Sequence, residues 1–257
     1  MSPYIRDDSK NERRVALKTL LYVLIAAELI FVLIYAMPNV RKSKSKLPVK
    51  TVCAVTYVLI GIPAALASGG YFTSYAILLT IGAVFGAIGD YSLNMDPKSK
   101  KFIIGVGSFL IGHVFYTAAF ATALVKNSAL QKKQIIMLTI SAAAVSLLVV
   151  AAGVLLKVSP GVGLPPVILY NLAISTMLVF AVSTAVNLIK NQGSGAYPAA
   201  LMVSLGAVLF VVSDAVLAII HFSKRKIKIP HAVNSWTYFP AQVMLALSIY
   251  FIQSLMV

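Results

Sequence analysis

Stretches of about 20 apolar residues recur along the whole 257-residue chain, and they constrain its fold more than any other feature. In an α-helix, about 20 residues span the roughly 30 Å hydrocarbon core of a bilayer. Backbone groups in hydrocarbon must be satisfied internally, so uninterrupted apolar stretches of this length cross as helices. We therefore expect an all-α fold, a polytopic membrane helical bundle of about eight transmembrane helices. The expected spans are residues 19–37, 49–67, 73–95, 102–125, 134–156, 165–189, 198–223 and 232–256.

The composition excludes an ordinary soluble domain. Charged residues make up 11% of the chain and hydrophobic residues 60%, whereas soluble domains carry about 25% charged residues. We expect a single integral membrane domain over residues 1–257, with residues 1–15 as a polar N-terminal tail. The first span is too long for the core of a signal peptide and lacks a small-residue cleavage site, so we expect it to be retained. The lone Cys53 excludes an intrachain disulfide.

The net charge of +15 comes from Lys and Arg residues that cluster at the ends of the expected helices, as in residues 41–46 and 224–228. This placement is typical of anchoring against anionic lipid headgroups, so we expect no nucleic-acid partner. The loops after the first, third, fifth and seventh spans hold thirteen of the basic residues and the other side holds nine. The excess predicts that the first set is cytoplasmic. The membrane is expected to be the endoplasmic reticulum in a eukaryote or the inner membrane in a bacterium.

Two aspartates lie inside apolar stretches, in similar phrases. Asp90 belongs to GAVFGAIGDYSL (residues 82–93) and Asp214 to GAVLFVVSDAVL (residues 206–217). A carboxyl in hydrocarbon costs roughly 3 kcal/mol even on lenient scales, so such residues usually face the protein interior and act there. The matching phrases are compatible with an internal duplication or with similar packing around similar groups. Glu28 is a third acid in an apolar stretch, without a matching phrase.

Helix direction alternates, so the depth of each polar residue follows from a rise of about 1.5 Å per residue. Asp90 is expected about 7 Å and Asp214 about 14 Å below the more basic side. Apart from Tyr116, near the midplane, the polar residues fall in the same half of the membrane, which predicts one polar pocket open toward the basic face. The supporting residues expected there are Asn94, His113, Tyr116, Tyr170, Asn171, Ser213, Tyr238 and Gln242.

A metal site is not indicated by the spacing of the ligand-type residues. The chain has three His residues but neither an H-x-x-x-H nor an H-E-x-x-H pair, and only His113 lies at the depth of the aspartates. The sequence also has no Gly-rich phosphate loop and no G-x-S-x-G elbow. We therefore assign no metal ligands and expect no cofactor.

Several spaced motifs resemble the YhhN family of membrane proteins, which includes the lysoplasmalogenases. The resemblance runs from the third expected helix to the end of the chain. It begins with G-D-x-x-L at residues 89–93 and continues with G-x-x-x-F-x-x-x-H-x-x-Y-x-x-A-F at residues 105–120. The seventh helix adds G-x-x-x-F-x-x-S-D at residues 206–214, and the eighth adds Y-x-x-A-Q at residues 238–242.

This resemblance implies hydrolysis of the vinyl-ether bond of a lysoplasmalogen, a lysophospholipid in the bilayer. The products are a fatty aldehyde and a glycerophospho-ethanolamine or glycerophospho-choline. Such a reaction needs a carboxylic acid that protonates the alkene and a second group that stabilises the cation or activates water. Asp90 and Asp214 are the expected catalytic pair, without a division of roles. The alternatives are a proton-coupled transporter, a metal-dependent lipid hydrolase, and two carboxyls that only stabilise the bundle.

Overall fold

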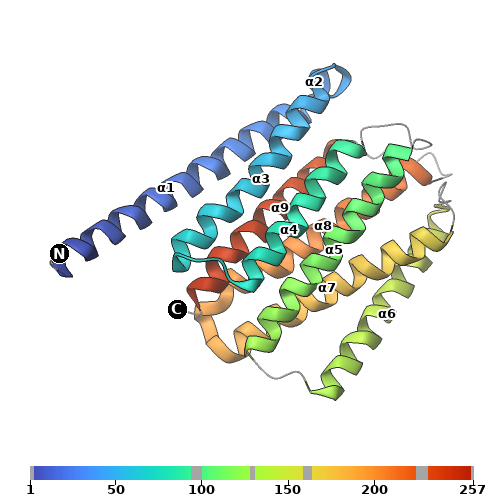
Figure 1. The fold of residues 1–257 in the computed structure, drawn as a ribbon. Helices are drawn as coiled ribbons and strands as arrows, with labels where there is room; N and C mark the ends of the chain where they lie inside the picture. Colours follow the sequence, from blue (N-terminus) through green and yellow to red (C-terminus); the bar gives the residue numbers. More distant parts are fainter. Residues whose placement is uncertain (1–2, 94–99, 128–130, 159–163, 224–230, 256–257) are drawn as a thin grey trace.

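The computed structural model describes residues 3–93, 100–127, 131–158, 164–223 and 231–255. These ranges are almost entirely helical, which confirms the expected helical membrane bundle (Figure 1). The elements are α1 (Pro3–Ala36), α2 (Pro38–Lys42), α3 (Lys46–Gly69), α4 (Ser74–Ser92), α5 (Lys100–Asn127), α6 (Lys132–Leu155), α7 (Leu164–Gln192), the short 3₁₀ helix η1 (Gly193–Ala196), α8 (Tyr197–Phe222) and α9 (His231–Ser254). The expected spans correspond in order to α1 and to α3 through α9.

Six stretches of the described residues are long and apolar enough to cross a membrane, and the last of them, Pro166–Ile220, takes in both α7 and α8. Helix α9 is not among these stretches because it carries several polar side chains along an otherwise apolar sequence. It packs against α1, α3, α4 and α8, so protein surrounds much of it. A helix in that position does not need an apolar surface on every side.

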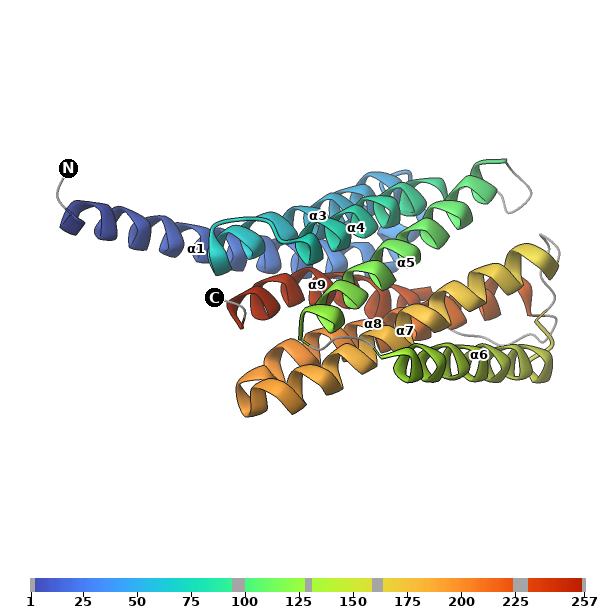
Figure 2. The ribbon, with the colours of Figure 1, turned by 60° about the horizontal axis from the view of Figure 1, so that its bottom comes forward.

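Helix α1 begins at Pro3, well before the start at residue 19 that the apolar pattern predicts. The expected polar tail, residues 1–15, is therefore helical from Pro3 onward. Residues 3–18 contain no Gly, include three Arg and two Lys residues, and have Pro in the first turn, where it is tolerated. Both ribbon views show this end of α1 projecting beyond the rest of the bundle (Figures 1 and 2).

The long helices run alternately up and down, so both chain termini lie at the end of the bundle away from α2 (Figure 1). Helix α3 packs against α1, α4 and α9, while α5 packs against α4 and α7. Helix α6 lies at the periphery and packs mainly against α7 (Figure 2). At the α2 end, Val158 and Ser223 form an isolated β-bridge that ties the end of α6 to the end of α8.

Two glycines allow turns or contacts that a larger residue would prevent. Gly70 closes α3 with a left-handed φ of 76°, and the chain then enters α4. On α4, a Cβ at Gly82 would lie 2.6 Å from the ring of Tyr116 and 3.1 Å from the carbonyl oxygen of Gly112. Helices α4 and α5 therefore approach closely, as small residues at a helix contact allow. This close packing carries Tyr116 into the centre of the bundle.

Candidate functional site

Asp90 of α4 and Asp214 of α8 line the same cavity, of about 100 Å³, at the α2 end of the bundle. We call this cavity the polar pocket. The two aspartates come from helices far apart in the sequence, and both line one polar pocket, as the sequence predicts. Its other lining residues are Tyr35, Arg41, Lys46, Lys50, Leu93, Phe109, Ser213, Leu217, Asn234, Ser235, Tyr238 and Phe239.

Asp90 is buried and is surrounded by hydrogen-bond donors. The ammonium of Lys50, at the start of α3, lies 3.0 Å from Oδ1. Tyr238 of α9 donates to Oδ2 at 2.7 Å, and Tyr57 of α3 donates to the same oxygen at 3.1 Å. A Lys ammonium, and a Tyr hydroxyl in this orientation, donate hydrogen bonds to the carboxyl rather than accept one from it. The arrangement around Asp90 is therefore that of an ionised carboxylate.

A chain of buried side chains extends this arrangement toward the centre of the bundle. Tyr116 of α5 donates to Oε1 of Gln242 at 2.6 Å, and the amide nitrogen of Gln242 donates to the hydroxyl of Tyr238 at 3.0 Å. Tyr238 then donates to Asp90. Each bond in the series points toward Asp90, so the three groups together favour negative charge on that carboxyl.

Asp214 has a different environment. Tyr170 of α7 donates to Oδ2 at 2.5 Å, and Nε2 of His113 lies 3.5 Å from the same oxygen. Because the Tyr170 hydroxyl donates its hydrogen to Asp214, the hydroxyl oxygen accepts the hydrogen bond from Nε2 of His113, at 3.2 Å. The other ring nitrogen of His113 contacts the sulfur of Met177 at 3.3 Å. Among the described residues, Oδ1 of Asp214 has no hydrogen-bond partner and no Lys or Arg forms an ion pair with this carboxyl.

The ring of Phe210 separates the two aspartate environments. It packs edge to face on His113, with ring centroids 4.9 Å apart, and on Tyr238, with centroids 5.4 Å apart. Phe210 is fully buried and lies one turn before Asp214 on α8. It therefore holds His113 and Tyr238 in place while keeping an apolar surface between them.

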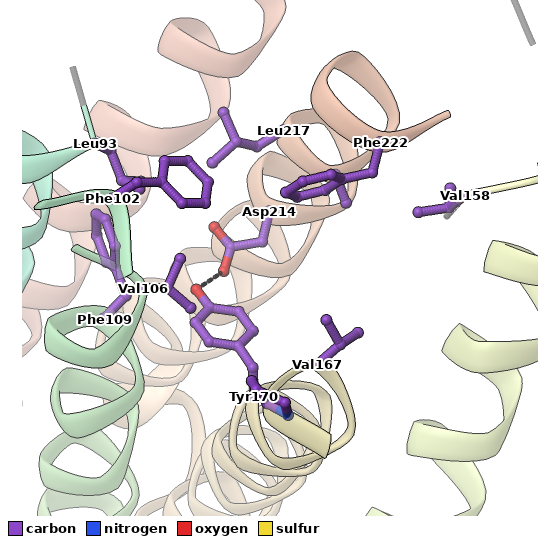
Figure 3. Close-up of a pocket in the computed structure, with 12 residues that line it drawn as sticks. Leu93, Phe102, Val106, Phe109, Val158, Val167, Tyr170, Asp214, Leu217 and Phe222 are labelled. Carbon is purple, nitrogen blue, oxygen red and sulfur yellow. Dashed lines mark hydrogen bonds between the residues drawn. The ribbon is translucent and has the colours of Figure 1, made fainter. Parts of the chain in front are cut away.

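A second cavity, of about 130 Å³, lies beside the polar pocket and is almost wholly apolar (Figure 3). We call it the apolar pocket. Figure 3 shows Asp214 and Tyr170 as its polar groups, joined by their hydrogen bond. The remaining lining residues are Leu93, Phe102, Val106, Phe109, Val158, Pro166, Val167, Leu217, Ala218 and Phe222. Leu93, Phe109, Asp214 and Leu217 line both pockets.

Of the expected supporting residues, Tyr170, Ser213 and Tyr238 line these pockets. His113, Tyr116 and Gln242 belong to the hydrogen-bonded networks around the two aspartates, whereas Asn171 does not. Its amide donates instead to the backbone oxygen of Ser146, at 2.9 Å, and to the Ser146 hydroxyl, at 2.8 Å. Asn171 therefore joins α7 to the peripheral α6. Ser213 lines the polar pocket and accepts two hydrogen bonds from Asn234. Asn94 lies outside the described residues.

Sequence reasoning missed four residues of the site. Lys50 and Tyr57 contact Asp90 directly, and Arg41 and Lys46 line the polar pocket. The three basic residues belong to a segment that the sequence assigns to headgroup anchoring, and nothing in that pattern separates an inward-facing cation from an outward-facing one. Tyr57 lies in the second expected span, before the motifs of the family resemblance begin, so no sequence pattern singled it out.

Comparison with family models matches residues 48–249 to the YhhN family. That match covers well over half of the chain. The chain belongs to the YhhN family. Comparison with curated proteins and with solved structures gives no match.

The region that matches the YhhN family begins two residues before Lys50 and includes both aspartates with all their hydrogen-bond partners described above. Arg41, Lys46 and Glu28 lie before it. Part of the polar pocket is therefore built by residues outside the YhhN match. Among the described residues, no group of three or more His, Cys, Asp or Glu side chains is placed to hold a metal ion.

Proposed function

We propose that this YhhN protein hydrolyses the vinyl-ether bond of lysoplasmalogens inside the membrane. The observation that carries the proposal is that Asp214 lines both pockets, at the boundary between an apolar and a polar cavity. In a lysoplasmalogen, the vinyl ether is the junction between a hydrocarbon chain and a polar glycerophosphate. With the chain in the apolar pocket and the glycerophosphate in the polar pocket, the bond to be cleaved lies beside Asp214.

Asp214 acts as the general acid. Its Oδ1 has no partner among the described residues and so is free to carry the proton, while Oδ2 is held by Tyr170. Once the proton has left, the Tyr170 hydroxyl and the Nε2–H of His113 both face the new carboxylate. These donors stabilise the charge that develops on Asp214 in the transition state, which is where preorganised donors are most effective.

Asp90 is the carboxylate of the resting site and acts as the general base. Lys50 balances its charge, and Tyr57 and Tyr238 hold its orientation. A carboxylate in the same pocket as the acid stabilises a cationic intermediate and accepts a proton from water. This division of roles parallels that of the two carboxyls of glycosidases, which also pass through an oxocarbenium-like state.

Asp214 transfers its proton to the alkene carbon farther from the ether oxygen, and the π electrons form the new C–H bond to leave an oxocarbenium ion. Water adds to the carbon bonded to that oxygen, and Asp90 takes the proton from water. The hemiacetal then returns its hydroxyl proton to Asp214 as Asp90 protonates the leaving glycerol oxygen. The C–O bond breaks, which releases the aldehyde and restores both carboxyls.

The test is aldehyde release from a lysoplasmalogen by the purified protein, with Asp90→Asn and Asp214→Asn as variants. Each variant is expected to lose at least 100-fold in rate, the usual contribution of a general acid or base. Glu28→Gln is the matched control, because it changes a buried carboxyl that lines neither pocket. Its rate is expected to equal that of the wild type.

Absence of aldehyde release from the wild-type protein contradicts the proposal. Full activity of a folded Asp214→Asn variant contradicts the role of Asp214 as the acid. Activity that a chelator abolishes favours a metal-dependent hydrolase instead. The thermal unfolding of each variant in detergent is measured in parallel, so that loss of the fold is not mistaken for loss of chemistry.

A further inference from the structure

The polar pocket is lined by more cationic side chains than pair with its aspartates. Arg41, Lys46 and Lys50 all line it. Lys50 pairs with Asp90 at 3.0 Å, whereas Arg41 and Lys46 have no carboxylate partner among the described residues. Two cations therefore remain for a ligand, and they face a cavity rather than open solvent.

Arg41, on the short helix α2, is held in position by two contacts. Its guanidinium packs over the ring of Tyr35, 5.3 Å from the ring centroid, and one Nη donates to the hydroxyl of Ser235 at 3.3 Å. Ser235, near the start of α9, is itself buried. A guanidinium carries five N–H donors in a rigid fork, so this single bond leaves several for a bound anion.

The size of the pocket and its neighbour restrict what the anion can be. A cavity of about 100 Å³ has the volume of roughly three water molecules, which suits a phosphate group with its linking atoms and excludes a whole lipid. The adjoining apolar pocket shares four lining residues with it. A ligand that fills both has one hydrocarbon chain and a phosphate a few bonds beyond the end of that chain.

We propose that Arg41 and Lys46 form a binding site for the phosphate of a single-chain phospholipid. The site deepens the proposed function, because it places the substrate phosphate in the same pocket as the two aspartates, but binding there does not require turnover. Arg41 and Lys46 precede the segment that matches the family, residues 48–249, so this site belongs to the part of the chain that the family model does not cover.

The test is the affinity of the purified protein for lysophosphatidylcholine, which carries a chain and a phosphate but no vinyl ether. Arg41→Gln and Lys46→Gln are each expected to weaken binding about tenfold, and Arg41→Lys is expected to recover part of that loss. Lys42→Gln is the matched control, since Lys42 is the exposed neighbour of Arg41 on α2 and does not line the pocket. Its affinity is expected to stay unchanged.

A monoacylglycerol with the same chain serves as the uncharged probe, and all of these variants are expected to bind it as the wild type does. Unchanged affinity of the Arg41→Gln, Lys46→Gln double variant for lysophosphatidylcholine overturns the proposal. Equal weakening for monoacylglycerol also overturns it, because the effect is then structural. Competition by millimolar inorganic phosphate assigns the site to the free anion as well, and its failure to compete restricts the site to a phosphate carried by a lipid. Charge-dependent binding in a protein that releases no aldehyde retains this site and removes only the proposed reaction.

Discussion

Lys50 holds Asp90 at two points: its ammonium lies 3.0 Å from Oδ1 and donates to the backbone carbonyl of the same residue at 3.1 Å. The bond to the carbonyl, near the C-terminal end of α4, ties the start of α3 to that end. Only 14% of the Lys50 side chain and 3% of the Asp90 side chain are exposed, so the pair is largely withdrawn from solvent. It therefore has both a structural and an electrostatic role.

Lys50→Met is expected to destabilise the protein by about 3 kcal/mol, because removing one partner leaves a buried carboxylate without its counter-ion. Unfolding in detergent gives the measurement. Adding Asp90→Asn to Lys50→Met is expected to recover part of the loss, since the unbalanced charge is then gone. Strictly additive effects of the two substitutions would show that the residues do not interact.

Tyr170→Phe is expected to lower the rate of aldehyde release about tenfold or more with little effect on KM, because it removes the donor to Asp214 at 2.5 Å. Tyr75→Phe is the matched control. Tyr75 is buried and bonds the Ser248 hydroxyl at 2.6 Å, but it lines neither pocket. Both variants are expected to lose similar stability, and only Tyr170→Phe to lose rate. An equal rate loss in both would assign the effect to packing.

Gly86→Ala is expected to destabilise the protein by about 1–3 kcal/mol, the range for overpacking a filled core. A Cβ at Gly86 would lie 2.8 Å from the amide nitrogen of Gln242 and 3.2 Å from the hydroxyl of Tyr57, so it also disturbs the donors to Asp90. A Cβ at Gly107 would meet nothing within 4 Å, so Gly107→Ala is expected to stabilise the protein by about 0.5–1 kcal/mol. Equal effects at the two sites contradict the close approach at Gly86.

Glu28→Leu is expected to stabilise the protein by about 1 kcal/mol or more. Glu28 is buried, and neither of its carboxyl oxygens has a hydrogen-bond partner among the described residues. A buried polar group without a partner costs free energy that an apolar residue of similar size does not. A lower midpoint of thermal unfolding in this variant would reveal that the Glu28 carboxyl makes a stabilising interaction.

The helices, and the pocket that Asp90 and Asp214 share, could be predicted from the sequence because both depend on simple spacing. Long apolar stretches correspond to helices, and a fixed rise per residue gives the height of each group in the bilayer. The same reasoning placed the start of α1 too late, since residues 3–18 are helical without being apolar. Polar helix formers leave no mark in a hydropathy pattern.

Height does not reveal which way a side chain points. Tyr170 and Asn171 lie at almost the same depth, yet successive residues are about 100° apart around a helix. Tyr170 therefore contacts Asp214 while Asn171 contacts Ser146 on the outer helix α6. Lys50 shows the same limit at a helix end, where an inward-facing ammonium and a headgroup anchor have the same sequence pattern.

The apolar residues that line both pockets affect chain preference and headgroup preference together. Leu93, Phe109 and Leu217 line the apolar pocket on one side and the polar pocket on the other, so under the proposed function they contact both the chain and the polar end of the substrate. Enlarging any of them to exclude a longer or bulkier chain also narrows the space beside Asp90. Chain selectivity and headgroup selectivity are therefore coupled traits at these positions, and substitutions elsewhere in each pocket are the route to altering one without the other.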